Sequence, residues 1–145
     1  DRDSLVHYLR LAGERAFDAA AFDDAVGYFE KALSLMPDDD QLGRAQLLER
    51  LAMALRSVGR WQDALGTMND SLDRYQTLGQ VEAIGRLGWA MVYQLVWTAR
   101  FVEGVQVGQR TLAGSIDFCG RQIDTCVRDG VGLISTVPLG CLDSA

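Results

Sequence analysis

The chain has 145 residues, enough for one domain of ordinary size. Of these residues, 48% are hydrophobic and 23% are charged, a balance typical of a folded globular protein rather than a disordered one. The net charge of −6 argues against direct binding to nucleic acid, because contacts with phosphates need clustered Lys and Arg side chains. Three Cys and one His argue against a structural zinc site and a disulfide framework.

The acidic charge is concentrated at the amino end. Residues 1–40 contain four basic and ten acidic side chains, whereas residues 41–145 contain ten of each. Lys31 is the single Lys among the 14 basic residues, and we interpret this bias towards Arg as a sign of a GC-rich bacterial genome. The sequence shows neither a basic segment followed by an apolar run nor an uninterrupted apolar stretch of about 18 residues. We therefore expect no signal peptide, no membrane span and a cytoplasmic location.

Residues 4–19 and 22–36 are predicted to form a first pair of helices. Apolar residues recur three and four positions apart in both segments, which is the period of a helix. The aromatic residue Phe22 opens the second helix, and the small residue Ala25 allows the two helices to approach closely. The acidic run 38–40 that follows is expected to end this pair and to cap the next helix.

The pattern returns over residues 42–58 and 61–76, which are predicted to form a second pair of helices. Trp61 takes the aromatic position, 39 residues after the first aromatic residue. We expect its ring to lock the two helices together, so that its removal would cost about 3–5 kcal/mol.

A third pair, predicted over residues 80–98 and 101–115, follows the pattern less closely. Its aromatic residue lies 40 residues after that of the second pair. Val92 replaces the small residue of the first helix, and Gly104 and Gly108 replace the small and bulky residues of the second.

Residues 116–145 do not continue the pattern and are punctuated by Gly and Pro. We expect a short helix near residues 116–128 and then an irregular tail. Cys119 and Cys126 would lie about 10 Å apart on such a helix, beyond disulfide reach, so we interpret them as small buried apolar residues. The third pair is rich in Val and poor in charge, so we expect this end to pack on further repeats or a partner chain, or to be capped by the tail.

The three pairs resemble tetratricopeptide repeats. The match is best in the first pair, where the motif positions are held by Gly13, Phe22, Ala25, Phe29, Ala32 and Pro37. In the second pair, Ser71 stands where the family has Ala, and Gln76 stands where it has Pro. The resemblance implies an all-α, right-handed solenoid of about three antiparallel helical hairpins in residues 1–115, with repeats at about 6–39, 45–78 and 85–118.

The spacing of 39 and 40 residues exceeds the family length of about 34. Such stretched repeats are similar to the sensor arms of bacterial signal-transduction ATPases and of ATPase-linked nucleotide cyclases. The resemblance also implies that the first helix of each pair lines a concave groove. The predicted groove residues are Arg10, Glu14, Glu49, Met53, Arg56, Arg86, Trp89, Tyr93 and Trp97, together with His7, Phe17, Asp18, Gln46, Ser57 and Val96.

Trp89, Tyr93 and Trp97 follow one another at four-residue intervals and therefore share one helix face. An aromatic stripe on a concave face is suited to bind a peptide or a partner helix. The alternative is that the rings belong to the core or cover a neighbouring helix. A clamp for a peptide carboxylate is disfavoured, because Glu14 and Met53 occupy places where it would need polar or basic side chains. Arg10 and Arg86 remain as candidate anion contacts.

These features predict a protein- or peptide-binding module, a sensor or scaffold arm of a larger bacterial regulator. The alternative is an oligomerisation or spacer module without a ligand, and self-association fits either function. We expect no enzyme, because the acid–base pair that the sequence offers, His7 and Glu14, would need a closed pocket that an open stack of hairpins does not provide. We also expect no cofactor, no metal, no nucleic-acid partner and no membrane partner.

Overall fold

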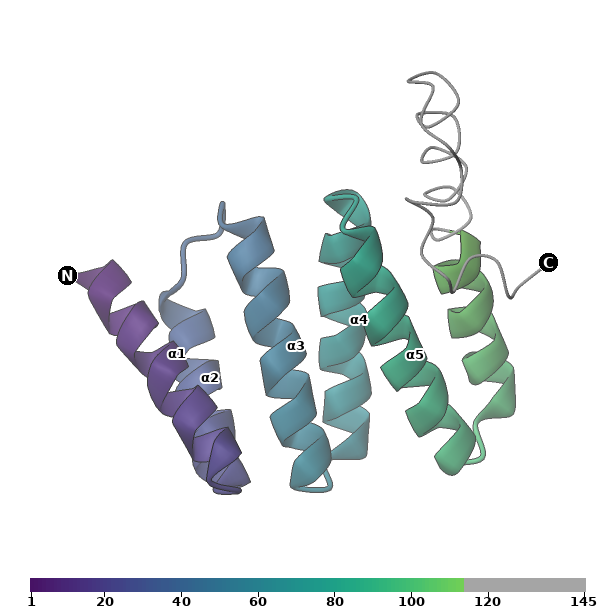
Figure 1. Ribbon diagram of the computed structural model, residues 1–145, viewed down its shortest axis with the longest axis horizontal. Coiled ribbons are helices and arrows are strands. Elements are labelled where there is room, and N and C mark those ends of the chain that lie inside the picture. Colours follow the sequence, from purple (N-terminus) through teal and green to yellow (C-terminus); the bar gives the residue numbers. More distant parts are fainter. Residues whose placement is uncertain (114–145) are drawn as a thin grey trace, which may run out of the picture. The chain divides into compact units, whose positions relative to one another are not determined.

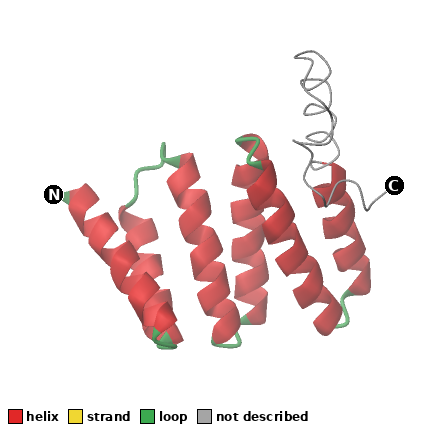
Figure 2. Cartoon of the chain, viewed as in Figure 1, coloured by secondary structure: helices red, strands yellow, loops and turns green. Residues whose placement is uncertain are grey.

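The computed structural model describes residues 1–113, and this part of the chain is helical without a strand (Figure 2). The helices are α1 (Arg2–Asp18), α2 (Phe22–Leu35), α3 (Gln41–Ser57), α4 (Trp61–Thr77), α5 (Val81–Trp97) and a further helix over residues 101–113 (Figure 1). The predicted ranges agree with these bounds to within a residue or two. The predictions for residues 116–145, including those for Cys119 and Cys126, lie outside the described residues.

The chain divides into two compact units, Asp1–Ala83 and Ile84–Ala145. The first unit holds α1 to α4, and the second holds nearly all of α5 and helix 101–113. In the first unit, α1 packs on α2, α2 on α3 and α3 on α4. Helix α2 therefore joins two successive pairs of helices.

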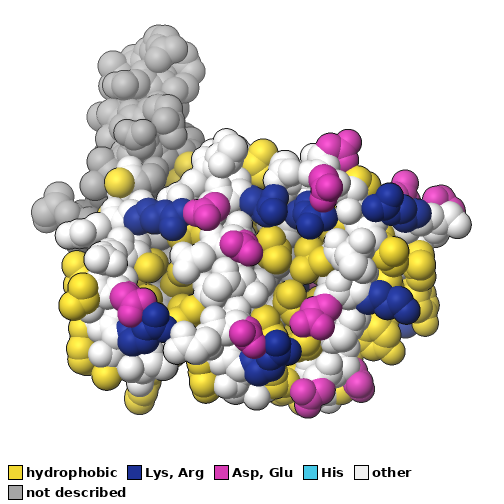
Figure 3. Space-filling view, turned by 180° about the vertical axis from the view of Figure 1, so that it is seen from behind, with side chains coloured by type: hydrophobic (Ala, Val, Ile, Leu, Met, Phe, Trp, Pro, Cys, Tyr) yellow, Lys and Arg dark blue, Asp and Glu magenta, His cyan; other side chains and the backbone are white. Residues whose placement is uncertain are grey.

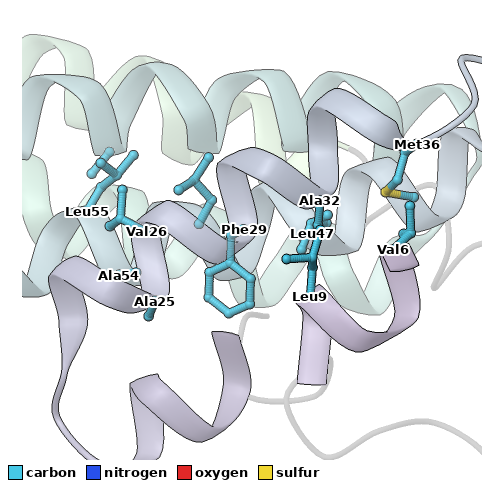
Figure 4. Close-up of a cluster of buried hydrophobic side chains, with 12 residues drawn as sticks. Val6, Leu9, Ala25, Val26, Phe29, Ala32, Met36, Leu47, Ala54 and Leu55 are labelled. Atoms are coloured by element: carbon cyan, nitrogen blue, oxygen red, sulfur yellow. The ribbon is translucent and has the colours of Figure 1, made fainter. Parts of the chain in front are cut away.

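The core of the first unit is centred on α2 (Figure 4). The ring of Phe29 is buried there, and a Cβ atom at Gly13 of α1 would overlap it. Gly13 is therefore the residue that lets α1 approach the aromatic ring. The other members of this buried cluster come from all four helices: Val6, Leu9, Ala25, Val26, Ala32, Met36, Leu47, Leu51, Ala54, Leu55 and Ala64.

The same turn connects the two helices of each pair. Its central residue is Ala20 in the first pair, Gly59 in the second and Ala99 in the third, with φ angles of 59°, 80° and 58°. In each turn, the amide of the following residue donates to a carbonyl five positions earlier, at distances of 2.8, 2.9 and 2.8 Å. A hydrogen bond from the sixth residue back to the first, together with a residue in the left-handed conformation, defines a Schellman motif at the end of the first helix. The same ending occurs at Gly79, with a φ angle of 67°, between α4 and α5, where the Gln80 amide donates to the Tyr75 carbonyl at 2.9 Å. The turn therefore recurs both within and between pairs of helices.

The acidic run before α3 has the predicted capping role. The side chain of Asp40 accepts a hydrogen bond from the backbone amide of Gly43 at 2.9 Å. This bond satisfies one of the amides that a helix leaves free at its start.

The prediction that Trp61 locks the second pair was wrong. Its side chain is 47% exposed, because Trp61 is the first residue of α4 and its ring lies at the end of the pair. In the first pair, Phe22 makes an edge-to-face contact with Phe17 at 5.2 Å between ring centroids. The second pair has Arg56 at the position that corresponds to Phe17. The contact between α3 and α4 is instead filled by buried residues further along α4: Ala64, Leu65, Met68 and Leu72.

The substitutions that make the third pair depart from the repeat pattern are matched to one another. A large residue of the second helix faces a small residue of the first helix in the first pair, where Phe29 faces Gly13. In the third pair the sizes are exchanged, and a Cβ atom at Gly108 would lie 3.9 Å from Cγ2 of Val92. In this pair the larger side chain at the contact comes from the first helix, as Val92, and the small residue comes from the second helix, as Gly108.

Candidate functional site

Helix α5 carries an exposed aromatic stripe. Trp89, Tyr93 and Trp97 are 71%, 52% and 73% exposed, and Val96 beside them is also exposed. The rings of Tyr93 and Trp97 meet edge to face, with their centroids 6.0 Å apart. The opposite side of the helix is buried through Ile84, Leu87, Gly88, Met91, Gln94 and Leu95.

The stripe therefore lies on the surface of the second unit and not in its core. Scattered exposed apolar residues are normal on proteins, but adjoining large apolar side chains on one face mark sites of interaction. Trp and Tyr also combine a large apolar surface with a hydrogen-bond donor, which suits them to contacts with partners. Arg86 lies on the same helix, one turn before Trp89, and is exposed as well.

Two of the predicted groove residues of the first unit, Glu14 and Glu49, have partners within that unit. Glu14 of α1 forms a two-pronged ion pair with Arg50 of α3, with N–O distances of 2.9 and 2.7 Å. This pair ties two successive first helices together, so the Glu14 carboxylate serves packing. Sequence reasoning missed Arg50, because no local pattern connects residues that lie 36 positions apart.

Glu49 of α3 also has a partner within the first unit. Its carboxylate accepts a hydrogen bond from the hydroxyl of Tyr75 at 2.8 Å, and Tyr75 is a buried residue of α4. The side chain of Glu49 thus reaches towards α4. No motif in the sequence points to this pair, because Tyr75 lies outside the motif positions.

Arg10 and Arg56 are half-buried cations of the first unit. Within the described residues, the structure gives neither of them an ion-pair partner. Arg10 lines a hollow of about 350 Å³ together with His7, Met36 and the acidic side chain of Asp40. Its surroundings therefore carry charges of both signs.

Other charged side chains are paired on the surface. Figure 3 shows basic and acidic side chains next to one another among hydrophobic ones. Arg60 pairs with Asp63 at the start of α4, and Arg100 pairs with Glu103 at the start of helix 101–113. The hydrogen bond from Arg100 lowers the pKa of the Glu103 carboxyl and raises the pKa of Arg100 itself.

A second apolar surface lies on the amino-terminal side of the first unit, and sequence reasoning missed it. Leu5, Tyr8 and Leu11 of α1 and Tyr28 of α2 are exposed. A hollow of about 500 Å³ is lined by Tyr8, Leu11, Ala12, Arg15, Ala16, Ala21, Asp24 and Tyr28. The sequence signal that could have revealed this surface is a second set of apolar residues on α1. Leu5 and Tyr8 each stand one position before a buried residue of that helix, Val6 and Leu9.

No family model matches the chain, and no curated protein sequence is similar to it. Within residues 1–113, no group of His, Cys, Asp and Glu side chains is arranged to hold a metal ion. None of the helices in this part of the chain combines the length and the apolar character needed to cross a membrane.

Proposed function

We propose that the chain is a tetratricopeptide-like solenoid that binds a protein or peptide through the aromatic stripe of α5. The left-handed turns at Ala20, Gly59, Gly79 and Ala99, which end successive helices, support an architecture of short helices joined by tight turns. The exchange of sizes between Val92 and Gly108 supports a third repeat that follows the same packing rule. As the sequence resemblance implies, the proposed setting is a sensor or scaffold arm of a larger regulator in the bacterial cytoplasm.

The exposure of Trp89, Tyr93 and Trp97 is the observation that carries the proposed binding function. One side of α5 is already buried, so packing among the described residues of the second unit does not account for rings on the other side. Each aromatic ring removes about 150–250 Å² from water when a partner covers it. Rings of this kind are among the residues that contribute most to binding energy at protein interfaces.

The residues around the stripe favour a ligand with apolar side chains and an acidic group. Arg86 places a positively charged guanidinium group on the helix that carries the rings, and positive charge favours an acidic ligand. The excess of acidic side chains in residues 1–40 lies on other helices. Local repulsion of an acidic peptide is therefore not expected on α5 itself.

The test uses synthetic peptides with alternating apolar and acidic residues, and binding is followed by the fluorescence of the Trp residues. We expect Trp89→Ala to weaken binding about 30-fold, because loss of an anchor ring costs about 2 kcal/mol. Trp61→Ala is the matched control, since it removes another exposed Trp from the first unit.

Peptides in which Lys replaces the acidic residues should bind more weakly than the acidic peptides. The proposal fails if the acidic peptides do not bind, or if both Trp variants lose the same affinity. It also fails if Trp89→Ala unfolds the chain while the affinity of each folded molecule stays unchanged.

A further inference from the structure

The exposed face of α5 between Arg86 and Trp97 is rich in hydrogen-bond donors. Its exposed side chains are Arg86, Trp89, Tyr93, Val96 and Trp97. Trp and Arg side chains carry donors and no acceptor, whereas the hydroxyl of Tyr can both donate and accept. The Tyr93 hydroxyl is therefore the only side-chain acceptor among these exposed residues.

The polar groups of the aromatic stripe are available to a ligand. Within residues 1–113, the structure gives no hydrogen-bond partner to the indole N–H groups of Trp89 and Trp97 or to the hydroxyl of Tyr93. Exposed groups of this kind bind water. A ligand that covers them has to supply acceptors in place of the water, because a covered donor without an acceptor carries an energetic cost.

The peptide that suits this face presents backbone carbonyls without backbone N–H groups. A peptide in a strand conformation exposes both kinds of group, and the face offers a single side-chain acceptor for its N–H groups. A helical peptide uses most of its carbonyls within the helix, so it offers few acceptors to the indoles. A proline-rich segment has no N–H group at each Pro, and its carbonyls stay free of internal hydrogen bonds in a polyproline II helix.

The length of the stripe also suits a polyproline II helix. Trp89 and Trp97 are separated by about 12 Å along α5, at about 1.5 Å per residue. About four residue steps of polyproline II, at about 3.1 Å each, cover the same distance. The ring centroids of Tyr93 and Trp97 lie 6.0 Å apart, close to two such steps. Proline rings lie on every side of a run of Pro, so each aromatic ring meets apolar surface in any register.

We propose that the aromatic stripe binds a proline-rich segment in the polyproline II conformation, with an acidic residue at the end near Arg86. Arg86 lies one turn before Trp89 and places its positive charge at one end of the stripe. The indole N–H groups and the Tyr93 hydroxyl donate to carbonyl oxygens of the segment, while the rings pack on its prolines. Such a segment is close to its bound conformation beforehand, so it loses little conformational entropy on binding. This inference rests on the proposed function, because it names the ligand class of the same surface.

The test compares three synthetic peptides of equal length and equal Glu content. The first has a run of Pro after its Glu residues, the second has Val and Thr in place of Pro, and the third has Ala and Leu in place of Pro. Binding to the complete 145-residue chain is followed by Trp fluorescence, since the peptides contain no Trp. We expect the Pro peptide to bind about tenfold more tightly than either of the others, the effect of one hydrogen bond made rather than lost.

Tyr93→Phe tests the hydrogen bonds without removing a ring. The change deletes the hydroxyl alone from a side chain that is 52% exposed, so circular dichroism should show unchanged helix content. We expect binding of the Pro peptide to weaken by about 3- to 10-fold, and binding of the Ala–Leu peptide to stay the same. Tyr8→Phe is the matched control, because it deletes the hydroxyl of an exposed Tyr in the first unit and should leave binding of the Pro peptide unchanged.

The outcomes distinguish this inference from the proposed function. If the Val–Thr or the Ala–Leu peptide binds as tightly as the Pro peptide, the inference is overturned. The proposed function then stands, provided that Trp89→Ala weakens the binding. If Tyr93→Phe weakens binding of the Pro peptide no more than Tyr8→Phe does, the Tyr93 hydroxyl makes no hydrogen bond to the ligand and the inference is likewise overturned. If none of the three peptides binds, both the inference and the proposed function fail.

Discussion

The left-handed turn between α1 and α2 makes a sharp prediction about stability. Ala20 adopts a φ angle of 59°, where an L-residue other than Gly has an energetic cost of about 1–2 kcal/mol. Gly avoids this cost but loses about 0.5–1 kcal/mol more on folding, because its unfolded chain is more flexible. Ala20 is exposed, so its methyl group contributes little packing. We therefore expect Ala20→Gly to raise the free energy of unfolding by about 0.5–1 kcal/mol.

The adjoining residue supplies the control. Ala19 has a φ angle of −82°, which any residue adopts, so Ala19→Gly should lower stability by about 0.5–1 kcal/mol. Gly59 occupies the same turn position in the second pair, and a Cβ atom there would meet only Nε1 of Trp61 at 3.9 Å. Gly59→Ala should therefore be destabilising by about 1 kcal/mol through the backbone alone.

Chemical unfolding followed by circular dichroism measures these differences. The expected order of stability is Ala20→Gly, then the native chain, then Ala19→Gly and Gly59→Ala. If Ala20→Gly and Ala19→Gly change stability in the same direction, the turn does not have the left-handed residue at position 20. An unchanged dependence on denaturant would show that the compactness of the unfolded chain is the same in each variant.

Two further predictions concern packing. Gly13→Ala should lower the free energy of unfolding by about 1–3 kcal/mol, because its Cβ atom would overlap the Phe29 ring. Gly108→Ala should instead be neutral or stabilising by up to about 1 kcal/mol. Thermal unfolding of both variants checks the contrast. Trp61→Ala should lower the free energy of unfolding by less than about 1 kcal/mol. Met68→Ala in the same helix should lower it by about 2–5 kcal/mol, because the Met68 side chain is fully buried. Equal losses of stability in urea unfolding would contradict the exposed position of Trp61.

The positions of the helices could be predicted from the sequence alone. The spacing of apolar residues, the acidic run before α3 and the breaks near residues 20, 59 and 99 act within one or two turns of the chain. Hydrogen bonds of helices and turns join residues at most five positions apart in these cases, so their causes are local in sequence. The same-face arrangement of Trp89, Tyr93 and Trp97 follows from the helical period for the same reason.

The surroundings of the side chains were decided by tertiary structure. The sequence could not show that Trp61 is exposed, that Glu14 pairs with Arg50 across 36 positions, or that Gly108 accommodates Val92. Each of these outcomes depends on which residue of another helix lies opposite the side chain. A motif position predicts only the helix on which a residue lies. Burial and ion pairing are properties of two surfaces in contact, so they become defined only when the helices pack.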